Sequence, residues 1–195
     1  FDTEKWANFF AITNLNYYPH ARAAKSVKFF YNPVSAKFEP IGYDAHRSVP
    51  NYNKNIKSWY NLPIQNSFQD ALNCKKNLKN CIEYSGRLNG NYLVYRFFFD
   101  HFGNLNKEFF QKYRTAVLKV SSIEFLDSFF SEREKQIEKI NSLIYDDYFF
   151  VDHNYFYGPG LYYFSKEDIY IRAKNLQVFF ENNIEKILVE QENDK

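Results

Sequence analysis

Methionine is absent from this chain of 195 residues, and cysteine occurs only twice, at Cys74 and Cys81. With no further cysteine or histidine at ligand spacing, the two cysteines do not indicate a zinc site. On one continuous helix they would lie about 10 Å apart along the axis, too far to bridge, whereas in a loop they could form a small disulfide. Two free thiols and one disulfide therefore both stay open. No Gly-x-Ser-x-Gly motif is present, so nothing supports a hydrolase.

The chain also lacks an excess of either charge and a long apolar run. Lysine and arginine number 25 against 23 aspartate and glutamate, which gives a formal net charge of +2. This balance leaves no broad basic field for a phosphate backbone, so we expect no nucleic-acid partner. No stretch reaches the roughly 18 apolar residues of a membrane span, so we expect no transmembrane segment. Because Phe1 is not an initiator, we expect an excised domain or fragment whose targeting segment lay upstream.

Hydrophobic residues make up 45% of the chain and aromatic residues 21%, enough to bury a core. We expect one domain over residues 1–195 in the α+β class, dominated by helix. A helix and a hairpin region occupy 1–48, a long loop 49–65 and helices 66–190. The tail 191–195 is expected to be disordered.

Apolar residues at helical spacing place the expected helices. The first runs from Thr3 to Tyr17, capped by Asp2 or Thr3, with Trp6, Phe9, Phe10 and Thr13 inward. Later helices are expected from 66 or 67 to 78 and from 106 onward, whereas 92–101 is too short to assign. The sequence 121–124 resembles a capping box for a helix to about Tyr145. Its expected inward residues are Leu126, Phe129, Phe130, Ile137, Ile140 and Ile144.

The last helix begins at 165–168, and Arg172 stands within its apolar side. We expect the Arg172 guanidinium to pair with a carboxylate or to extend outward to solvent. The expected buried residues are Ile169, Ala173, Leu176, Phe180, Ile184, Ile187 and Leu188.

Two β-type runs, 27–31 and 37–41, flank the linker Asn-Pro-Val-Ser-Ala, which predicts a hairpin. Pro40 indicates that the second strand is short or at an edge. Asp44 and His46 follow two residues apart, so their side chains share a face if the strand continues. An aspartate directly after a strand commonly caps a turn, so composition alone does not make it a ligand.

The hairpin lies within a longer pattern. Residues 2–11 read Asp-Thr-Glu-Lys-Trp-Ala-Asn-Phe-Phe-Ala, and residues 29–41 read Phe-Phe-Tyr-Asn-Pro-Val-Ser-Ala-Lys-Phe-Glu-Pro-Ile. Tyr43-Asp44-Ala45-His46 follows, in the place of an acidic motif Trp-Asp-x-Asp. This order resembles the CotH-type protein kinases, an atypical kinase family named for a spore-coat protein. About 45 residues carry the resemblance, and the later helices are similar to the family's with less specificity.

The resemblance implies a protein-kinase-like C-lobe in which the hairpin presents Asp44 to the Mg²⁺ that bridges the ATP phosphates. The reaction would transfer a phosphoryl group from ATP to a serine or threonine of a protein substrate. His20 falls on the family's catalytic-loop acid, Ser26 on its asparagine and His46 on its second acid. A histidine can accept the proton of a substrate hydroxyl, and Ser26 and His46 would support metal or phosphate.

The family's nucleotide-clamping N-lobe is not in the chain, so we expect it upstream and expect no activity from this part alone. Members of the family are commonly exported or surface-associated. One alternative is a catalytically degenerate, pseudokinase-like scaffold of the cell envelope or surface that binds other proteins. A further alternative is a Zn²⁺ or Fe²⁺ site made by His20, Asp44 and His46. Convergence of His20, Ser26, Asp44 and His46 on one cleft would separate a metal-binding protein from a scaffold.

Overall fold

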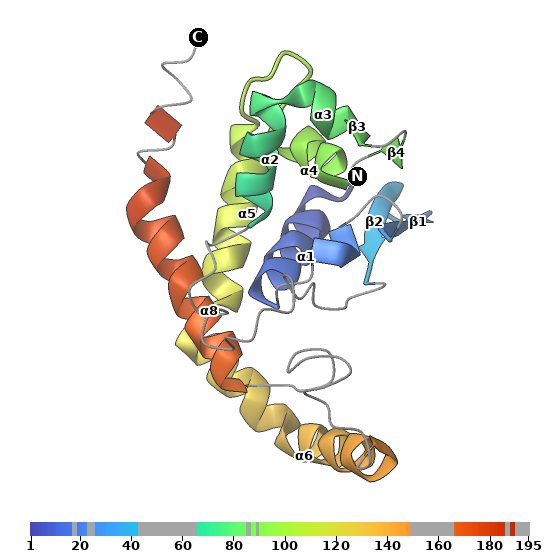
Figure 1. Ribbon diagram of the computed structural model, residues 1–195, viewed down its shortest axis with the longest axis vertical. Coiled ribbons are helices and arrows are strands. Elements are labelled where there is room, and N and C mark those ends of the chain that lie inside the picture. Colours follow the sequence, from blue (N-terminus) through green and yellow to red (C-terminus); the bar gives the residue numbers. More distant parts are fainter. Residues whose placement is uncertain are drawn as a thin grey trace.

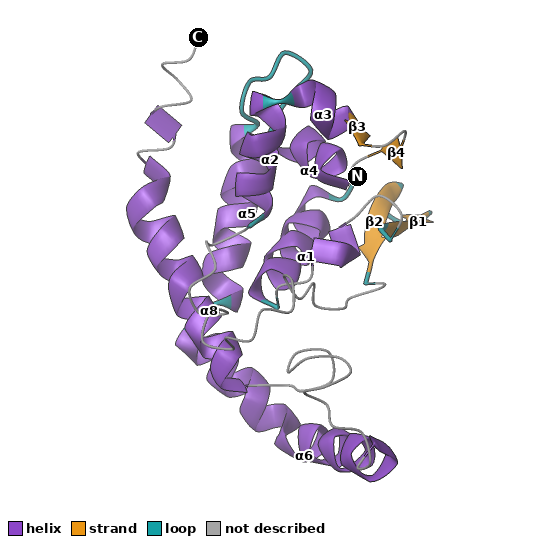
Figure 2. Cartoon of the chain, viewed as in Figure 1, coloured by secondary structure: helices purple, strands orange, loops and turns teal. Residues whose placement is uncertain are grey.

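A computed structural model defines residues 1–16, 19–22, 26–42, 66–84, 87–88, 90–148, 166–185 and 188–189. The chain over these residues is mainly helical and contains two short antiparallel hairpins (Figure 2). The mainly helical α+β class is therefore confirmed. The loop expected over 49–65 and the tail expected to be disordered over 191–195 lie outside the described residues.

The first helix, α1 (Thr3–Leu15), begins at an aspartate cap. The Asp2 side chain accepts a hydrogen bond from the Lys5 amide at 3.1 Å, which satisfies one of the free N–H groups of the first turn. The helix ends two residues before the predicted end at Tyr17. Most of the predicted inward residues are confirmed as buried and one, Phe9, is partly buried. The buried set comprises Trp6, Ala7, Phe10, Ala11, Thr13, Asn14 and Leu15.

The predicted hairpin is confirmed as β1 (Lys28–Asn32) and β2 (Lys37–Ile41), paired in antiparallel register. The Asn32 side chain accepts a hydrogen bond from the Val34 amide at 2.9 Å, and Ala36 has a positive φ of 54° at the end of the turn. The hairpin is attached to α1 along β2, because the Phe38 carbonyl accepts hydrogen bonds from the Asp2 amide and the Trp6 indole. Figure 1 accordingly shows β2 between α1 and β1.

The middle of the chain contains α2 (Ser67–Lys76), α3 (Leu78–Ile82), a small hairpin of β3 (Glu83–Tyr84) and β4 (Arg87–Leu88), and α4 (Gly90–Phe98). The residues left unassigned at 92–101 thus include most of α4. Asn77 interrupts the helix between α2 and α3, and its non-helical backbone brings Cys74 and Cys81 to a Cα–Cα distance of 5.1 Å. They form a disulfide, because the break removes the separation that a continuous helix would impose.

The core lies between α1, α2, α4, α5 (Lys107–Val120) and α8 (Lys166–Val178). α5 begins at the predicted Asn106, whose side chain accepts from the Phe109 amide. Helix α1 packs beside α5, α2 packs against α4, and α8 covers α5 and α1 (Figure 1). Aromatic rings dominate this core, so dispersion and apolar burial hold the helices together. The largest fully buried side chains are Trp6, Tyr113, Phe10, Phe68, Phe98, Phe99, Phe109, Phe110 and Phe180, with Leu126, Leu176 and Ile184.

Helix α6 (Ile123–Tyr148) extends away from this body (Figure 1). Its cap is Ser122, whose Oγ accepts from the Phe125 amide at 3.2 Å, while Ser121 bonds to the last turn of α5. The predicted inward residues Leu126 and Phe130 are buried and Ile137 is partly buried. The prediction was wrong for Phe129 and Ile140, which are 38% and 48% exposed, because the helix runs past the core that would cover them. The side chain of Ile144 lies outside the described set.

The last helix follows the predicted pattern. Ile169, Ala173 and Leu176 are buried in α8, and Phe180 and Ile184 are buried in and after the π-helical segment η3 (Phe179–Asn183). Leu188 is partly buried, and Ile187 lies outside the described residues. The Arg172 guanidinium donates to the main-chain carbonyl of Asn14 at 2.6 Å, an acceptor that the prediction of a carboxylate or solvent did not include. None of the described helices has the length and apolar character to cross a membrane.

Candidate functional site

A buried ion pair holds the turn that contains His20 to the helical core. The chain after α1 forms one 3₁₀ turn, η1 (Pro19–Arg22), and the Arg22 Nη1 atom donates to Asp70 Oδ2 at 2.9 Å and to Ser67 Oγ at 2.7 Å. The Arg22 and Asp70 side chains are only 5% and 4% exposed. Because an unpaired charge at such a depth is strongly unfavourable, this pair fixes η1 against the first turn of α2.

The ion pair continues into a chain of buried hydrogen bonds. Ser67 Oγ donates to Asn14 Oδ1 at 3.2 Å, and Asn14 Nδ2 donates to the Tyr113 hydroxyl at 2.5 Å. Burial raises the pKa of the Tyr113 hydroxyl well above its ordinary value, so the group stays protonated. These hydrogen bonds join α1, α2 and α5 to η1.

The Arg22 guanidinium has a further buried donor, its Nε atom. Arg22 Nε is buried and has no hydrogen-bond partner within the described part of the chain. Leaving a buried N–H group without an acceptor costs about 1–3 kcal/mol, so an oxygen atom of a carbonyl, a water or an anion is favoured there. As an N–H donor, Arg22 suits a phosphate oxygen and not a metal ion.

The hairpin register determines where the predicted site residues enter. Lys28 pairs with Ile41, so Ser26 and Gly42 lie at the same open end of the hairpin. Ser26 is buried, with 2% of its surface exposed. Asp44 is two residues beyond Gly42, and both Asp44 and His46 lie outside the described residues.

His20 is described only in its backbone, which belongs to η1; its side chain lies outside the described set. The structure thus brings Ser26 to the end of the hairpin from which the segment with Asp44 leaves. Convergence of all four side chains on one point stays a prediction. Among the described residues, no group of three or more histidine, cysteine, aspartate or glutamate side chains is arranged to hold a metal ion.

A second polar cluster joins the hairpin to α1. The Glu39 carboxylate, 5% exposed, accepts from Lys5 Nζ at 2.6 Å and from Asn32 Nδ2 at 2.7 Å. The hydrogen bond from Lys5, helped by that from Asn32, holds the pKa of the Glu39 carboxyl below its ordinary value, and the same contact raises the pKa of Lys5. Both carboxylate oxygens are therefore engaged within the protein, and the cluster serves to attach β2.

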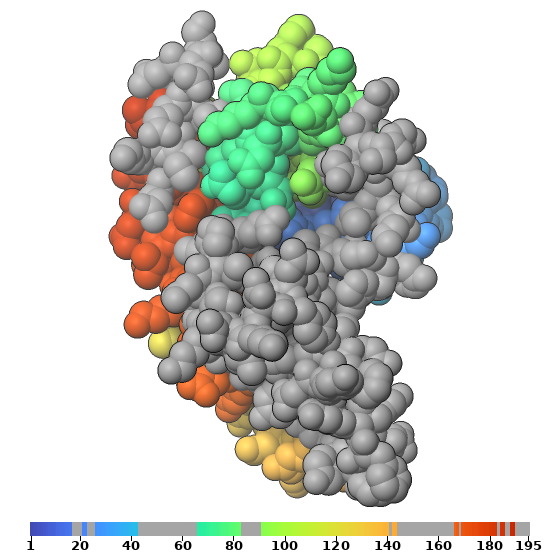
Figure 3. Space-filling model, in the orientation of Figure 1, coloured from blue at the N-terminus to red at the C-terminus, as the bar shows by residue number. Residues whose placement is uncertain are grey.

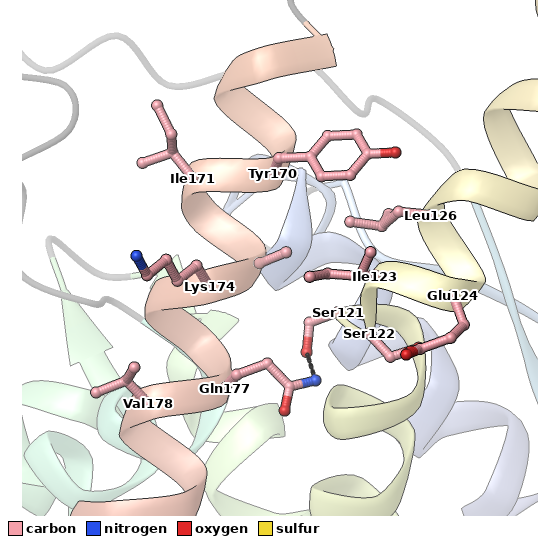
Figure 4. A pocket seen from close by; sticks show the side chains of 11 residues that line it. Ser121, Ser122, Ile123, Glu124, Leu126, Tyr170, Ile171, Lys174, Gln177 and Val178 are labelled. Carbon is pink, nitrogen blue, oxygen red and sulfur yellow. Dashed lines mark hydrogen bonds between the residues drawn. The ribbon is translucent and has the colours of Figure 1, made fainter.

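A pocket of about 590 Å³ lies elsewhere, between the first turn of α6 and one face of α8 (Figure 4). From α8, Tyr170 and Gln177 reach toward α6 and the end of α5. Gln177 Nε2 donates to the Leu118 carbonyl at 2.7 Å and to Ser121 Oγ at 3.0 Å. The amide of Gln177 is therefore engaged within the protein, and the other polar side chains of the lining include Ser122, Glu124 and Lys174. The apolar side chains lining it are Ile123, Leu126, Ile171, Ala173 and Val178.

Sequence reasoning missed the buried network. Asp70 in the first turn of a helix fits an ordinary interaction with the helix dipole, and Tyr113 fits the apolar stripe of α5. Nothing along the chain links Asn14, Arg22 and Ser67 with either of them, because their separations range up to 99 residues. A charged residue close to a predicted site residue, as Arg22 is to His20, was the one available signal.

Comparison of the chain with protein-family models, with curated proteins and with solved structures gives no match.

Proposed function

We propose that the chain is the C-lobe of a CotH-like kinase that transfers a phosphoryl group from ATP to serine or threonine of a protein. Asp44 is the Mg²⁺ ligand, His20 stands at the position of the base, and Ser26 and His46 support the metal or the phosphates. In this proposal the protein works at the cell surface or outside the cell. The Cys74–Cys81 disulfide supports that location, because disulfides persist in oxidising compartments.

The observation that carries the proposal is the anchoring of η1, the turn that contains His20. A helix, a polar turn and a hairpin follow one another in the order that the resemblance requires, and the turn is held by the buried pair of Arg22 and Asp70. A catalytic group must be held within a fraction of an ångström of its working position, and a buried ion pair supplies such rigidity.

The donor set fits Mg²⁺ through oxygen atoms. The Asp44 carboxylate and the Ser26 hydroxyl, directly or through water, are the hard ligands that Mg²⁺ prefers, and Mg²⁺ when bound neutralises charge on the ATP phosphates. The imidazole of His20 would accept the proton of the attacking hydroxyl. The unpartnered Arg22 Nε lies two residues from His20 in sequence and is suited to an anionic oxygen.

A second candidate is a pseudokinase-like scaffold that binds other surface proteins. It is favoured by the histidines at positions 20 and 46, where the family has acids, since imidazole is a weak ligand for Mg²⁺. The same two histidines, with Asp44, make the third candidate, a Zn²⁺ or Fe²⁺ site.

The test is thermal unfolding of the longest natural form of the protein that contains this chain, with and without ATP and Mg²⁺. A ligand at 100 times its dissociation constant stabilises the folded state by about 2.7 kcal/mol, which a melting curve resolves. We expect ATP to raise the melting temperature only when Mg²⁺ is present. This increase should be lost in Asp44→Asn and kept in Glu134→Gln, a matched change on the exposed face of α6.

No rise in any variant would support the scaffold instead. A rise with Zn²⁺ or Fe²⁺ alone that disappears in His20→Ala and Asp44→Asn would support the transition-metal site. Unchanged melting on adding those metals would exclude it.

A further inference from the structure

Among the described residues, the hairpin has one edge that is protected and one edge that no strand pairs with. On the outer side of β2, Pro40 lacks an N–H group and the Phe38 carbonyl is occupied by the Asp2 amide and the Trp6 indole, at 2.9 and 3.1 Å. On the outer side of β1, no other strand pairs within the described residues, and Figure 1 shows β1 farther from α1 than β2. Soluble proteins usually protect such an edge with lysine, proline, a bulge or an inward charge, and the strand β1 has only Lys28, at its first position, among these.

The register identifies the backbone groups on that edge of β1. Phe29 pairs with Pro40, which cannot donate, so this is a pair without ladder hydrogen bonds. The Phe29 and Tyr31 N–H and C=O groups therefore point away from β2, whereas those of Phe30 point toward it. Each copy of the chain thus presents two residues, Phe29 and Tyr31, ready to pair with another strand.

The side chains along this edge are aromatic and exposed. Phe29, Phe30 and Tyr31 are 46%, 45% and 53% exposed, and Phe38 and Phe1 are 41% and 55% exposed. On one face, the ring of Phe38 lies 5.6 Å from Phe29 and 5.4 Å from Tyr31, and Phe1 lies 6.1 Å from Phe29. In Figure 3, atoms of the hairpin segment, drawn in light blue, lie at the right margin of the molecule.

We propose that β1 pairs with β1 of a second copy of this chain, antiparallel and centred on Phe30, to form a four-stranded sheet. In this register Phe29 lies opposite the partner's Tyr31 and exchanges two hydrogen bonds with it, and Tyr31 does the same with the partner's Phe29. Phe30 meets the partner's Phe30 on the twofold axis, and Lys28 lies opposite the partner's Asn32. All five strand residues are paired and no like charges face each other.

The exposed aromatic surface near this edge is comparable in area to a small dimer interface. At 150–250 Å² for each aromatic side chain, the five exposed rings leave about 500 Å² of aromatic surface on each copy, so two copies offer about 1,000 Å². That value is the lower bound for a specific interface, before the backbone bonds are included. The formal charge of +2 produces little repulsion between copies. The proposal is independent of phosphoryl transfer, because it uses the outer edge of β1 and not its open end.

Cysteine crosslinking tests both the dimer and its register. Opposed residues in a pair without ladder bonds have Cα atoms about 4.5 Å apart, within disulfide range. Phe30→Cys is therefore expected to give a covalent dimer under mild oxidation, and Val34→Cys, at a turn residue that is 95% exposed, is expected to give little. The two native cysteines are bonded to each other and do not interfere. Equal crosslinking at the two positions, or stronger crosslinking in Phe29→Cys, would overturn the proposed register.

Sedimentation velocity over a concentration series tests the association without a crosslink. We expect a concentration-dependent dimer that is weakened at least about tenfold in Phe30→Lys, because two ammonium groups would meet on the axis. Ile140→Lys, at an equally exposed apolar residue of α6, is expected to leave the dimer unchanged. A wild-type chain that stays monomeric at every concentration would overturn the proposal and leave the edge to a strand from another protein.

Discussion

Arg22 and Asp70, 48 residues apart in the chain, form a 2.9 Å ion pair between side chains that are almost completely buried. The pair connects a 3₁₀ turn to the first turn of a helix beyond a long intervening segment. It is the contact that fixes η1, the turn containing His20, against the helical core.

Replacing Asp70 by asparagine is expected to destabilise the protein by about 3–5 kcal/mol, because the Arg22 charge would remain buried without its partner. Urea unfolding followed by circular dichroism measures the loss. Glu108→Gln is the matched control, since it removes an exposed pair with Lys112 at i and i+4 that contributes about 0.5 kcal/mol or less. Equal effects of the two substitutions would show that the Arg22–Asp70 pair is not the anchor described here.

Tyr113→Phe is expected to cost about 1–3 kcal/mol although it removes a single oxygen atom. The Asn14 amide would lose its buried acceptor at 2.5 Å, and no water can replace it in a fully packed site. Tyr92→Phe, at a partly buried tyrosine that stacks on Tyr95, should change the free energy of unfolding little. A neutral Tyr113→Phe would mean that the hydroxyl is dispensable to the network.

The cluster at Glu39 predicts acid sensitivity of the hairpin. The hydrogen bond from Lys5 lowers the pKa of Glu39 in the folded state below the ordinary 4.5, so the folded protein binds this proton less readily than the unfolded chain. The stabilisation is complete above pH 4.5 and is lost as the pH falls through the lowered pKa. The free energy of unfolding, measured at a series of pH values from 6 to 2, should therefore decrease less steeply for Glu39→Gln than for the wild type. Parallel curves would contradict this assignment.

Reduction of the Cys74–Cys81 disulfide is expected to lower stability by about 2–3 kcal/mol, because the bond closes a loop with a sequence separation of seven. Thermal unfolding with and without a reductant measures the change. The double variant Cys74→Ser, Cys81→Ser should match the reduced wild type and show no response to the reductant. A response of that variant would trace the effect to something other than this bond.

The sequence was sufficient for local features. Asp2 and Asn106 start helices because their side chains accept the free amides of the first turn, and both were expected from the residue type. The Asn-Pro-Val-Ser-Ala linker set the hairpin to within one residue. The apolar spacing of α8 identified Ile169, Ala173 and Leu176 as buried. In each case the cause lies within a few residues along the chain.

The surroundings of the candidate site residues could not be predicted from the sequence, because they depend on contacts between residues far apart in the chain. Ser26 and Asp44 were assigned by resemblance, and the structure describes Ser26, whereas Asp44 lies outside the described residues. Burial also required the tertiary structure: Phe129 and Ile140 have the helical spacing of core residues, yet α6 extends past the body and leaves them exposed.

By itself, the sequence determined which segments form helices and where the hairpin turns, because caps, turn residues and apolar periodicity act between near neighbours. Only the tertiary structure decided that Asn77 interrupts the helix and lets Cys74 reach Cys81, and that Arg22 meets Asp70 beneath the turn. It also decided that β2 is attached to α1, while β1 pairs with no strand other than β2 in the described part of the chain. Those outcomes follow from the packing of segments far apart in the chain. Burial in that packing determines how much each charge, aromatic ring and backbone group contributes to the free energy of folding.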